Sequence, residues 1–477
     1  MRRTRFPFFA AASFLAVALP SVAATHPHYG GSLRVEMRER VASLDPRRMT
    51  ADAPGAAAAE PLASLVYERL VSVGGDARPQ PVLALAWQHD AEFKRWQFRL
   101  RPGVKFHEAS PLTAMAISAA WQDFFGSERR IRAAGEWLEI ESDIPMPGLL
   151  EELSRGRYFV FHVAADGSLS GTGPFRVAAW QPGVRLVVAA NEDYWAGRPF
   201  LDAVEIDMGR ARREQLVDLE LGKGDLVELA PEQVRRATQS GARASASAPV
   251  ELLALEFNRD RPAARDARLR EALALSIDRT SIVNVLLHRQ GEAAGCLLPQ
   301  WLSGYAFLFA TSSNLARARA LRAELSAALP LVLVYDAADA EARVVAERVA
   351  VNAREVGIAA QVSAQAASAA GTHDARLVRV HLVPSEPRAA LAALAAALGL
   401  ADALPPGERP EASGPEQLYA AERAIVEGFR VIPLAYLPET YGLGPRVRNW
   451  TAPRWGGWRL EDVWLETSSP ASVGEKP

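Results

Sequence analysis

Short runs with a hydrophobic period of two alternate along the chain with longer runs whose period is near 3.6. The first pattern predicts strands with one buried face, and the second predicts amphipathic helices. Strands are predicted at Ser32–Met37, Trp96–Leu100, Arg185–Ala189, Val204–Met208, Leu252–Phe257, Leu331–Tyr335, Ala359–Val362 and Arg379–Leu382. Helices are predicted at Asp266–Leu287, Glu341–Val356 and 388–399. The alternation indicates a layered α/β architecture rather than an all-helical or all-β one.

Finer details of this pattern predict a helix break, a pair of parallel strands and several linkers. The helical run from Asp266 to Leu287 is expected to break at Asp278, because Asp is a preferred N-cap for a second helix. The strand, helix and strand between Leu331 and Val362 form a β-α-β run, which predicts two parallel strands. Stretches rich in small and polar residues predict surface linkers at Thr238–Pro249, Ala364–Thr372 and Pro405–Gly414.

The first 24 residues have the features of a secretory signal peptide. Arginines at positions 2, 3 and 5 precede the apolar stretch Phe8–Leu19, and small residues follow at 21–24. The apolar stretch is shorter than the ~20 residues of a membrane-spanning helix. No Cys follows it, so a lipid anchor is not expected. We therefore expect an exported, periplasmic protein without a lipid anchor.

Composition narrows the class of protein. The 477 residues are 49% hydrophobic and 23% charged, which is ordinary for a globular protein, and the formal net charge is −2. That charge gives no basic surface for nucleic acid and no polybasic patch for a membrane. Cys296 is the single cysteine, so no internal disulfide is expected. A monomer that binds neither nucleic acid nor membrane is predicted.

The sequence offers little catalytic machinery. It has no H-E-x-x-H or C-x-x-C motif, no phosphate-binding glycine loop and no nucleophile elbow. Cys296 is expected to be an inert, small apolar side chain. His26 and His28 have the spacing of metal ligands but lie at the expected processed N-terminus. We expect no enzyme activity, no cofactor and no metal site. The eleven Trp residues are expected mainly in the core, with a subset facing an organic ligand.

Several motifs appear in a fixed order from residue 30 to residue 434. The most specific is Trp96–His107 (WQFRLRPGVKFH), completed by SPLTA at 110–114. The others are GGSLRV at 30–35, SLDP at 43–46, LVYERL at 65–70, PVLALAW at 81–87, GTGPF at 171–175, NEDYW at 191–195, GDLV at 224–227, Asn258, Arg268–Arg279 and IPL at 432–434. Together they resemble the extracellular solute-binding proteins of dipeptide, oligopeptide and nickel ABC importers, the family 5 periplasmic binding proteins.

The resemblance implies two α/β lobes of the periplasmic-binding-protein type, joined by crossing strands, with an accessory subdomain in the first lobe. The stretch from Thr113 to Gly171 is short for the family, which predicts a shortened accessory subdomain. The expected division is a signal peptide at 1–24, first-lobe segments at 25–60 and 171–252, an accessory subdomain at 61–170, a second lobe at 253–440, and a return to the first lobe with a C-terminal tail at 441–477.

Matching positions to the family predicts a ligand site between the lobes. The predicted site residues are Arg40, Val41, His381, Leu382 and Tyr436. A guanidinium such as that of Arg40 favours a carboxylate or phosphate on the ligand. Peptide-binding members usually have an Asp, which pairs with the peptide α-ammonium, where this chain has Val383. A buried ammonium without its carboxylate is costly, so weak or absent binding of ordinary peptides is predicted.

The resemblance implies a periplasmic receptor that captures a small organic solute, peptide-like or a modified peptide, and delivers it to the permease subunits of an ABC importer. Sugar-like molecules, opine-type compounds and metal chelates stay open as ligands. Two other functions stay open as well. One is a periplasmic sensor or partner protein with a degenerate cleft, and the other is a secreted hydrolase on a similar scaffold.

Overall fold

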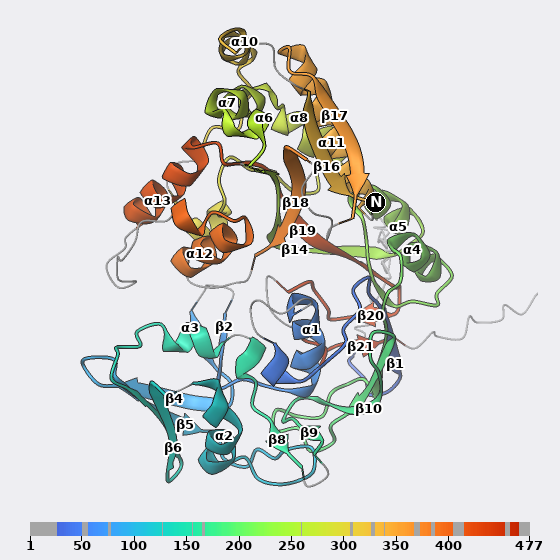
Figure 1. The fold of residues 1–477 in the computed structure, drawn as a ribbon. Coiled ribbons are helices and arrows are strands. Elements are labelled where there is room, and N and C mark those ends of the chain that lie inside the picture. The colour runs from blue at the N-terminus through green and yellow to red at the C-terminus, as the bar shows by residue number, and fades with distance from the viewer. Residues whose placement is uncertain are drawn as a thin grey trace, which may run out of the picture.

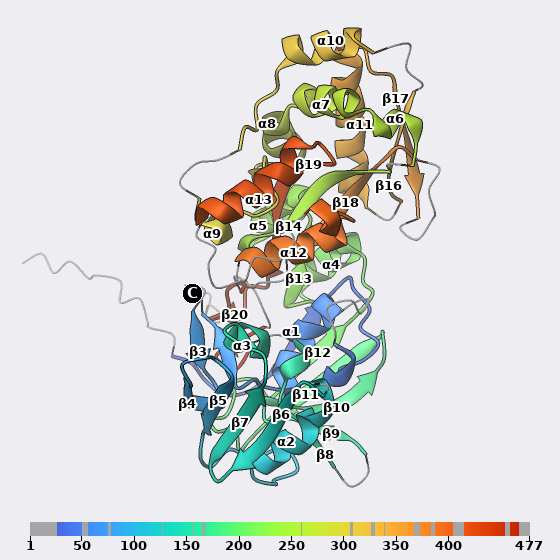
Figure 2. The same cartoon turned by 60° about the vertical axis from the view of Figure 1, so that its left-hand side comes forward.

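The computed structural model has two lobes, drawn one above the other in Figure 1 and turned in Figure 2. N-terminal segments form most of the lower, first lobe, the chain from about residue 250 to about residue 440 forms the upper, second lobe, and the chain then returns to the first lobe. The structure describes residues 26–49, 56–74, 78–125, 127–154, 156–164, 167–258, 260–305, 309–325, 330–337, 339–366, 373–382, 387–403, 415–453 and 458–466.

One mixed sheet of eleven strands, within the described residues, runs through both lobes. Its strands in spatial order are β10 (Phe175–Gln181), β11 (Arg185–Ala190), β12 (Ala203–Asp207), β1 (Ser32–Glu36), β13 (Leu226–Glu228), β19 (Val431–Leu443), β14 (Arg243–Phe257), β18 (Ala375–His381), β16 (Leu331–Asp336) and β17 (Ala360–Gln365). Strand β15 (Glu292–Ala293) pairs with β19 outside this path. The strands from β10 to β13 belong to the first lobe, and those from β18 to β17 belong to the second.

The two longest strands, β14 and β19, connect the lobes. They pair antiparallel with each other, while β19 also pairs with β13 below and β14 with β18 above. Their register is irregular on both sides of Pro249, which lies opposite Pro438. Proline has no N–H group, so neither residue donates to the ladder at this point. The ladder that connects the lobes is therefore interrupted at the Pro249–Pro438 pair.

The first lobe carries a second sheet. Strands β4 (Ala84–His89), β5 (Arg95–Leu100), β7 (Trp137–Ser142) and β6 (Arg129–Ala134) pair in that order, and α2 (Ala114–Trp121) packs on them. In β5 the alternate residues Trp96, Phe98 and Leu100 are buried, as their period predicts. The other first-lobe elements are α1 (Ala56–Val66), α3 (Leu149–Leu153), α4 (Arg212–Glu220), α5 (Val234–Gln239), β2 (Val71–Val73), β3 (Pro79–Pro81), β8 (His162–Val163), β9 (Leu169–Ser170), β20 (Val447–Arg448) and β21 (Trp464–Leu465).

The second lobe is built on the predicted β-α-β run. Helix α11 (Ala340–Glu355) connects β16 to β17, and these two strands are parallel. Two apolar cores lie on the sheet of this lobe, one under α11 and one under α12 and α13. The other helices of the lobe are α6 (Pro262–Arg265), α7 (Ala267–Ser276), α8 (Arg279–Ser281), α9 (Gln300–Ser303), α10 (Leu315–Ala323), α12 (Pro387–Ala397), α13 (Pro415–Glu427) and the π-helical turn η5 (Ile282–Leu286).

Short 3₁₀ turns complete the secondary structure. They are η1 (Pro46–Arg48), η2 (Gln122–Phe124), η3 (Gly156–Tyr158), η4 (Pro231–Gln233) and η6 (Ala401–Ala403). Among the described residues, no helix combines the length and the apolar character that crossing a bilayer requires.

Three of the sequence motifs meet at one buried carboxylate in the first lobe. Glu68 accepts hydrogen bonds from Thr172 Oγ1 at 2.8 Å, the Tyr194 hydroxyl at 2.9 Å and Trp195 Nε1 at 2.9 Å. Burial raises the pKa of Glu68 to about 7, although these hydrogen bonds oppose the rise. The VYE, GTG and YW motifs therefore belong to one packing unit of the lobe.

The predicted two-lobed α/β fold is confirmed, and most predicted elements lie within a few residues of their observed bounds. The break at Asp278 is confirmed, because its side chain accepts a hydrogen bond from the Ser281 amide at 2.9 Å. The linker predicted at Thr238–Pro249 is wrong from Arg243 onward, where the chain already lies in β14. Its Ala and Ser residues give no hydrophobic signal, and pairing with β19 makes the strand.

Several predictions lie outside the described residues. These are the signal peptide at 1–24, the linker at 405–414, most of the linker at 364–372, and Val383. The domain division stays a prediction. Its boundary at residue 252 lies inside β14, the strand that both lobes share.

Candidate functional site

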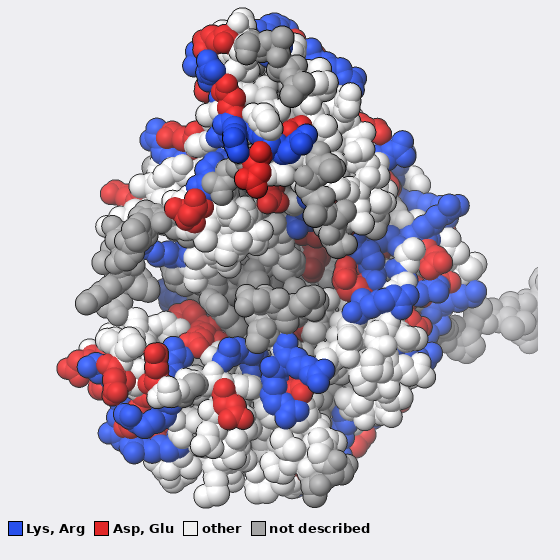
Figure 3. All heavy atoms as spheres, viewed as in Figure 1, with Lys and Arg blue, Asp and Glu red and all other residues white. Residues whose placement is uncertain are grey.

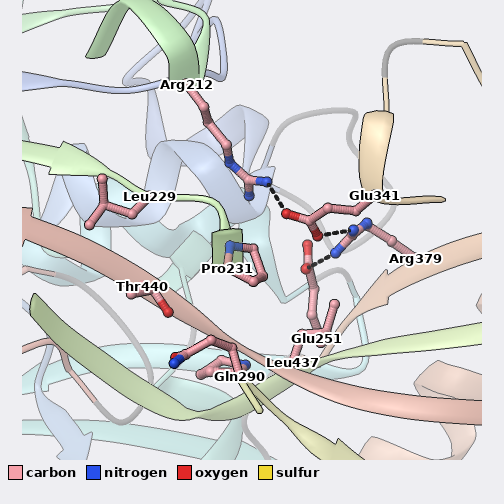
Figure 4. Close-up of a pocket in the computed structure, with 10 residues that line it drawn as sticks. Arg212, Leu229, Pro231, Glu251, Gln290, Glu341, Arg379, Leu437 and Thr440 are labelled. Carbon is pink, nitrogen blue, oxygen red and sulfur yellow. Dashed lines mark hydrogen bonds and ion pairs between the residues drawn. The ribbon is translucent and has the colours of Figure 1, made fainter. Parts of the chain in front are cut away.

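A small pocket lies where the two lobes meet beside the crossing strands (Figure 4). The first lobe contributes α4 and the loop after β13, and the second lobe contributes α11, β18 and the segment before β15. The lining residues are Arg212, Leu229, Pro231, Glu251, Gln290, Glu341, Arg379, Leu437, Pro438 and Thr440. On the face drawn in Figure 3, side chains of both charge signs gather where the lobes meet.

Arg379 is the central charge of this pocket. It extends from β18 and makes ion pairs with Glu251 at 2.9 Å, with Glu341 at 2.5 Å and with Asp339. The carboxylates come from β14, from the first turn of α11 and from the residue that caps α11. Segments far apart in the sequence therefore place three acids around one guanidinium.

The ionisation of this group follows from its geometry. Burial alone would lower the pKa of Arg379, but Glu251, Glu341 and Asp339 together raise it above its usual value. Burial alone would raise the pKa of Glu251 and of Asp339, but Arg379 lowers both below their ordinary values. These shifts favour the charged forms of Arg379, Glu251 and Asp339, so the cluster is held by compensated charges.

One ion pair of the pocket crosses between the lobes. Arg212 Nη1 lies 3.1 Å from Glu341 Oε1, while Glu341 Oε2 faces Arg379. Arg212 begins α4, which packs on β13 of the first lobe, and Glu341 lies in α11 of the second lobe. The dashed lines in Figure 4 trace the chain of charges from Arg212 through Glu341 to Arg379 and Glu251.

A further acid, Glu228, lies at the end of β13 beside this network. Burial raises its pKa, and the positive charges of Arg38 and Arg212 oppose the rise. Its Oε2 accepts a hydrogen bond from the Arg38 amide at 3.0 Å. The junction of the lobes is thus polar and charged, and its chemistry suits the binding of polar groups.

The two first-lobe residues predicted for the ligand site lie near each other, outside this pocket. Arg40 is exposed, and its Nη1 donates to the Gly183 carbonyl at 2.9 Å. A Cβ atom on Gly209 would lie 2.3 Å from Cζ of Arg40, so the guanidinium packs directly on that glycine. Val41 is buried in the first-lobe core. Arg40 is therefore held against the lobe by its own contacts.

Of the three second-lobe residues, His381 and Leu382 lie at the end of β18, and Tyr436 lies inside the crossing strand β19. His381 ends β18, and its Nδ1 lies 3.7 Å from Oε1 of Glu439. Leu382 and Tyr436 are buried in the same apolar cluster, next to α12 and α13. His381 pairs in register with Glu251, which lines the pocket of Figure 4, whereas His381, Leu382 and Tyr436 are not among the lining residues.

Sequence reasoning missed the four charged residues of the pocket: Arg212, Glu251, Glu341 and Arg379. A signal for two of them was present. Glu251 lies between Val250 and Leu252, and Arg379 lies between Val378 and Val380. A charged residue between apolar neighbours needs a partner when it is half-buried. Their partners were not predictable, because β14, α4, α11 and β18 meet only in the folded chain.

The remaining candidates for chemistry are the thiol of Cys296 and possible metal ligands. Cys296 is buried, and burial raises the pKa of its thiol to about 12, so the reactive thiolate is suppressed. Its Sγ donates to the Leu298 carbonyl at 3.0 Å. Within the described residues, His, Cys, Asp and Glu side chains form no group of three or more that could hold a metal ion.

Comparison with known proteins decides the family. The model of the bacterial extracellular solute-binding proteins, family 5, matches residues 78–146 and 163–398. The chain belongs to this family. The relatives named below are binding proteins rather than enzymes.

Two curated relatives of this family 5 protein come from Escherichia coli strain K12. The nickel-binding periplasmic protein is 25% identical over 332 residues, which are 62% of this chain and 59% of the relative. The probable D,D-dipeptide-binding periplasmic protein DdpA is 24% identical over 270 residues, which are 50% of this chain and 52% of that one. The chain thus spans about half the length of these curated relatives.

Solved structures share the fold over nearly the whole chain. The substrate-binding protein CtaP of Listeria monocytogenes has a TM-score of 0.78 at 15% identity, covering 92% of this chain and 100% of that one. NikA of Brucella suis has a TM-score of 0.76 at 19% identity, covering 91% and 100%. At these identities the likeness establishes the two-lobed architecture.

Proposed function

We propose that this family 5 protein is an exported receptor that captures a small organic solute between its lobes and delivers it to the permease subunits of an ABC importer. The observation that carries the proposal is the junction of the lobes. Two long strands connect the lobes, and a charged pocket there is lined from both sides. Two lobes on such a connection are built for hinge closure around a solute.

The solute class we propose is peptide-like or a modified peptide. Family membership supports this class, and one relative is described as a probable D,D-dipeptide-binding protein. We propose that Arg40, Val41, His381, Leu382 and Tyr436 border the solute. Burial of Leu382 and Tyr436 in one cluster supports a shared apolar wall on the second lobe. A metal chelate is the second candidate, since another relative is a nickel-binding protein.

Ordinary peptides with a free N-terminus are expected to bind weakly. Val383 stands where peptide-binding relatives carry the Asp that pairs with the α-ammonium group. An ammonium group buried without a carboxylate loses several kcal/mol in desolvation. Affinity of micromolar or tighter for unmodified di- to pentapeptides would contradict this expectation.

A thermal-shift screen of the purified protein tests the receptor function. The library should contain plain peptides, N-blocked peptides, opines, oligosaccharides and metal chelates. A solute at 100 times its dissociation constant adds about 2.7 kcal/mol to the free energy of unfolding, which raises Tm by a few degrees. Stabilisation by a blocked or non-peptide compound supports the proposal. A folded protein that no compound stabilises would favour the sensor or partner function, and turnover on a hydrolase substrate panel would favour an enzyme.

The site residues are tested on the solute that the screen identifies. Arg40→Ala and His381→Ala are each expected to weaken its binding, because both side chains lie at the proposed border of the solute. Arg235→Ala is the matched control, since Arg235 is an exposed arginine on α5. Unchanged affinity in both Arg40→Ala and His381→Ala would overturn this placement of the solute.

Three properties of the whole protein belong to the same proposal. Residues 1–24 act as a signal peptide, the exported chain is a monomer, and the domain division follows the boundaries predicted from the sequence. N-terminal sequencing of the exported protein tests the first. Sedimentation of the purified protein tests the second.

A further inference from the structure

The ion pair between Arg212 and Glu341 is placed to act on the motion of the lobes. Arg212 is fixed to the first lobe, because Leu216 and Leu219 of the same helix pack with Val227 of β13. Glu341 is fixed to the second lobe at the start of α11. The 3.1 Å contact between Nη1 and Oε1 is therefore sensitive to the relative position of the two lobes.

The carboxylate of Glu341 is held in place by other residues of the second lobe, independently of Arg212. Arg379 pairs with the other carboxylate oxygen of Glu341 at 2.5 Å, and Glu251 and Asp339 hold Arg379 in turn. Arg379 lies on β18, Asp339 is the cap of α11, and Glu251 lies on the second-lobe half of β14. Glu341 thus loses little side-chain freedom when Arg212 arrives, which favours the pair.

Partial burial limits the screening of this ion pair, and the other charges around it allow it to break and re-form. The side chain of Glu341 is 9% exposed and that of Arg212 is 25% exposed, so water and salt screen the contact only in part. If the lobes separated, Glu341 would keep Arg379 as its partner, and Arg212 would become hydrated. Opening would therefore break one ion pair without leaving an uncompensated buried charge.

An interruption of the ladder between the crossing strands lies next to this ion pair. Pro438 lines the same pocket, and it faces Pro249 where the ladder between β14 and β19 loses its donors. The Glu439 amide is satisfied instead by the Ser247 hydroxyl at 2.9 Å. A bend at this point would change the distance between α4 and α11 directly.

We propose that Arg212 is a positioning residue for solute capture, because its ion pair with Glu341 favours the arrangement in which both lobes line the pocket of Figure 4, which we assign as the closed one. It acts through closure rather than through a contact with the solute. The affinity for any solute held between the lobes scales with the fraction of protein in the competent arrangement. Arg212 thereby raises affinity without selecting among solutes. This inference rests on one part of the proposed receptor function, namely that the lobes close around a solute.

Pulsed electron-spin distance measurement on the purified chain tests the proposal. The native cysteine is removed by Cys296→Ala, and spin labels are attached through Ala134→Cys on β6 and Gln361→Cys on β17. Both label positions are exposed and lie on different lobes. The distance distribution between the labels then reports the populations of closed and open lobes.

The Arg212→Met variant keeps the aliphatic bulk of the side chain and removes its charge. It is expected to raise the open-to-closed ratio about tenfold, the size of effect typical of a hydrogen bond to a charged group. Arg212→Lys is expected to fall between Arg212→Met and the parent. Arg213→Met is the matched control, since it removes the same charge from the next, exposed position of α4 and should leave the distribution unchanged.

A distance distribution for Arg212→Met equal to that of the parent would overturn the proposal, as would an equal shift in Arg213→Met. This outcome is distinguishable from failure of the receptor function, which the solute screen on the parent protein decides alone. Where the screen yields a solute, Arg212→Met should lower the affinity for that solute by up to the same factor of about ten. Loss of one solute with retention of another would place Arg212 in the solute site instead.

Discussion

At the scale of single residues, Glu68 shows how a charged side chain becomes part of a core. Its carboxylate has three neutral hydrogen-bond donors and no cation among its hydrogen-bond partners in the described chain. Hydrogen bonds compensate only part of the desolvation of a carboxylate, so the pKa of Glu68 rises to about 7. The proton is therefore bound more tightly in the folded chain than in the unfolded chain, where the ordinary value of 4.5 applies.

Glu68 is expected to make the protein less stable as the pH rises. A raised pKa in the folded state gives a contribution that is complete below pH 4.5 and is lost as the pH rises to about 7. A shift of this size corresponds to about 3 kcal/mol. The Glu68→Gln variant has no such proton, so its Tm relative to that of the parent should increase between pH 5 and pH 8. A difference in Tm that stays constant with pH would contradict this expectation.

At the scale of elements, the GTG motif exists because a loop passes against the end of a helix. A Cβ atom on Gly171 would lie 2.0 Å from the Val66 carbonyl oxygen, and one on Gly173 would lie 2.6 Å from the carbonyl carbon. Val66 is the last residue of α1, and the Gly173 amide donates to its carbonyl at 2.9 Å. Only glycine permits this contact between two backbones.

The Gly173→Ala variant is expected to lose about 3 kcal/mol of unfolding free energy, because its methyl group would overlap backbone that cannot move freely. Urea unfolding measures this loss. Gly148→Ala is the matched control, because a Cβ atom at Gly148 meets nothing within 4 Å and its φ of −90° is accessible to alanine. A similar stability for the two variants would show that the loop moves away from α1 at little cost.

At the scale of the whole molecule, a cluster of charges lies where the lobes meet beside the crossing strands. Arg379 holds carboxylates from β14 and from the start of α11, and Arg212 extends the cluster to the first lobe. A buried charge cluster contributes specificity of arrangement, because each member needs a partner at a defined place. A junction of this kind suits lobes that separate and rejoin in one geometry.

Removal of the guanidinium of Arg379 should destabilise the protein far more than removal of the guanidinium of a surface arginine. Arg379→Met would leave Glu251, Glu341 and Asp339 close together without their shared cation, and about 3 kcal/mol of stability should be lost. Arg343→Met on α11 removes an arginine whose exposed partner is Glu347, so less than about 1 kcal/mol is expected. Thermal unfolding of the two variants compares them directly. Equal losses would mean that the cluster is solvated and weak.

The sequence by itself determined the elements and the fold class of this protein. Hydrophobic periodicity located β5, the β16-α11-β17 unit and the break at Asp278, because burial of one face and helix capping are local properties. The ordered motifs identified the family. The start of β14 was missed, because its Ala and Ser residues have no pattern of their own and become a strand only by pairing with β19.

The tertiary structure alone decided which charges meet. Arg212, Glu251, Glu341 and Arg379 are spread over 168 positions of the chain, and no spacing relates them. Their contact depends on the crossing of β14 and β19 and on the approach of α4 to α11. The same holds for Glu68, whose donors lie more than a hundred residues away. Local sequence sets local conformation, whereas pairing of distant charges is set by the packing of the elements that carry them.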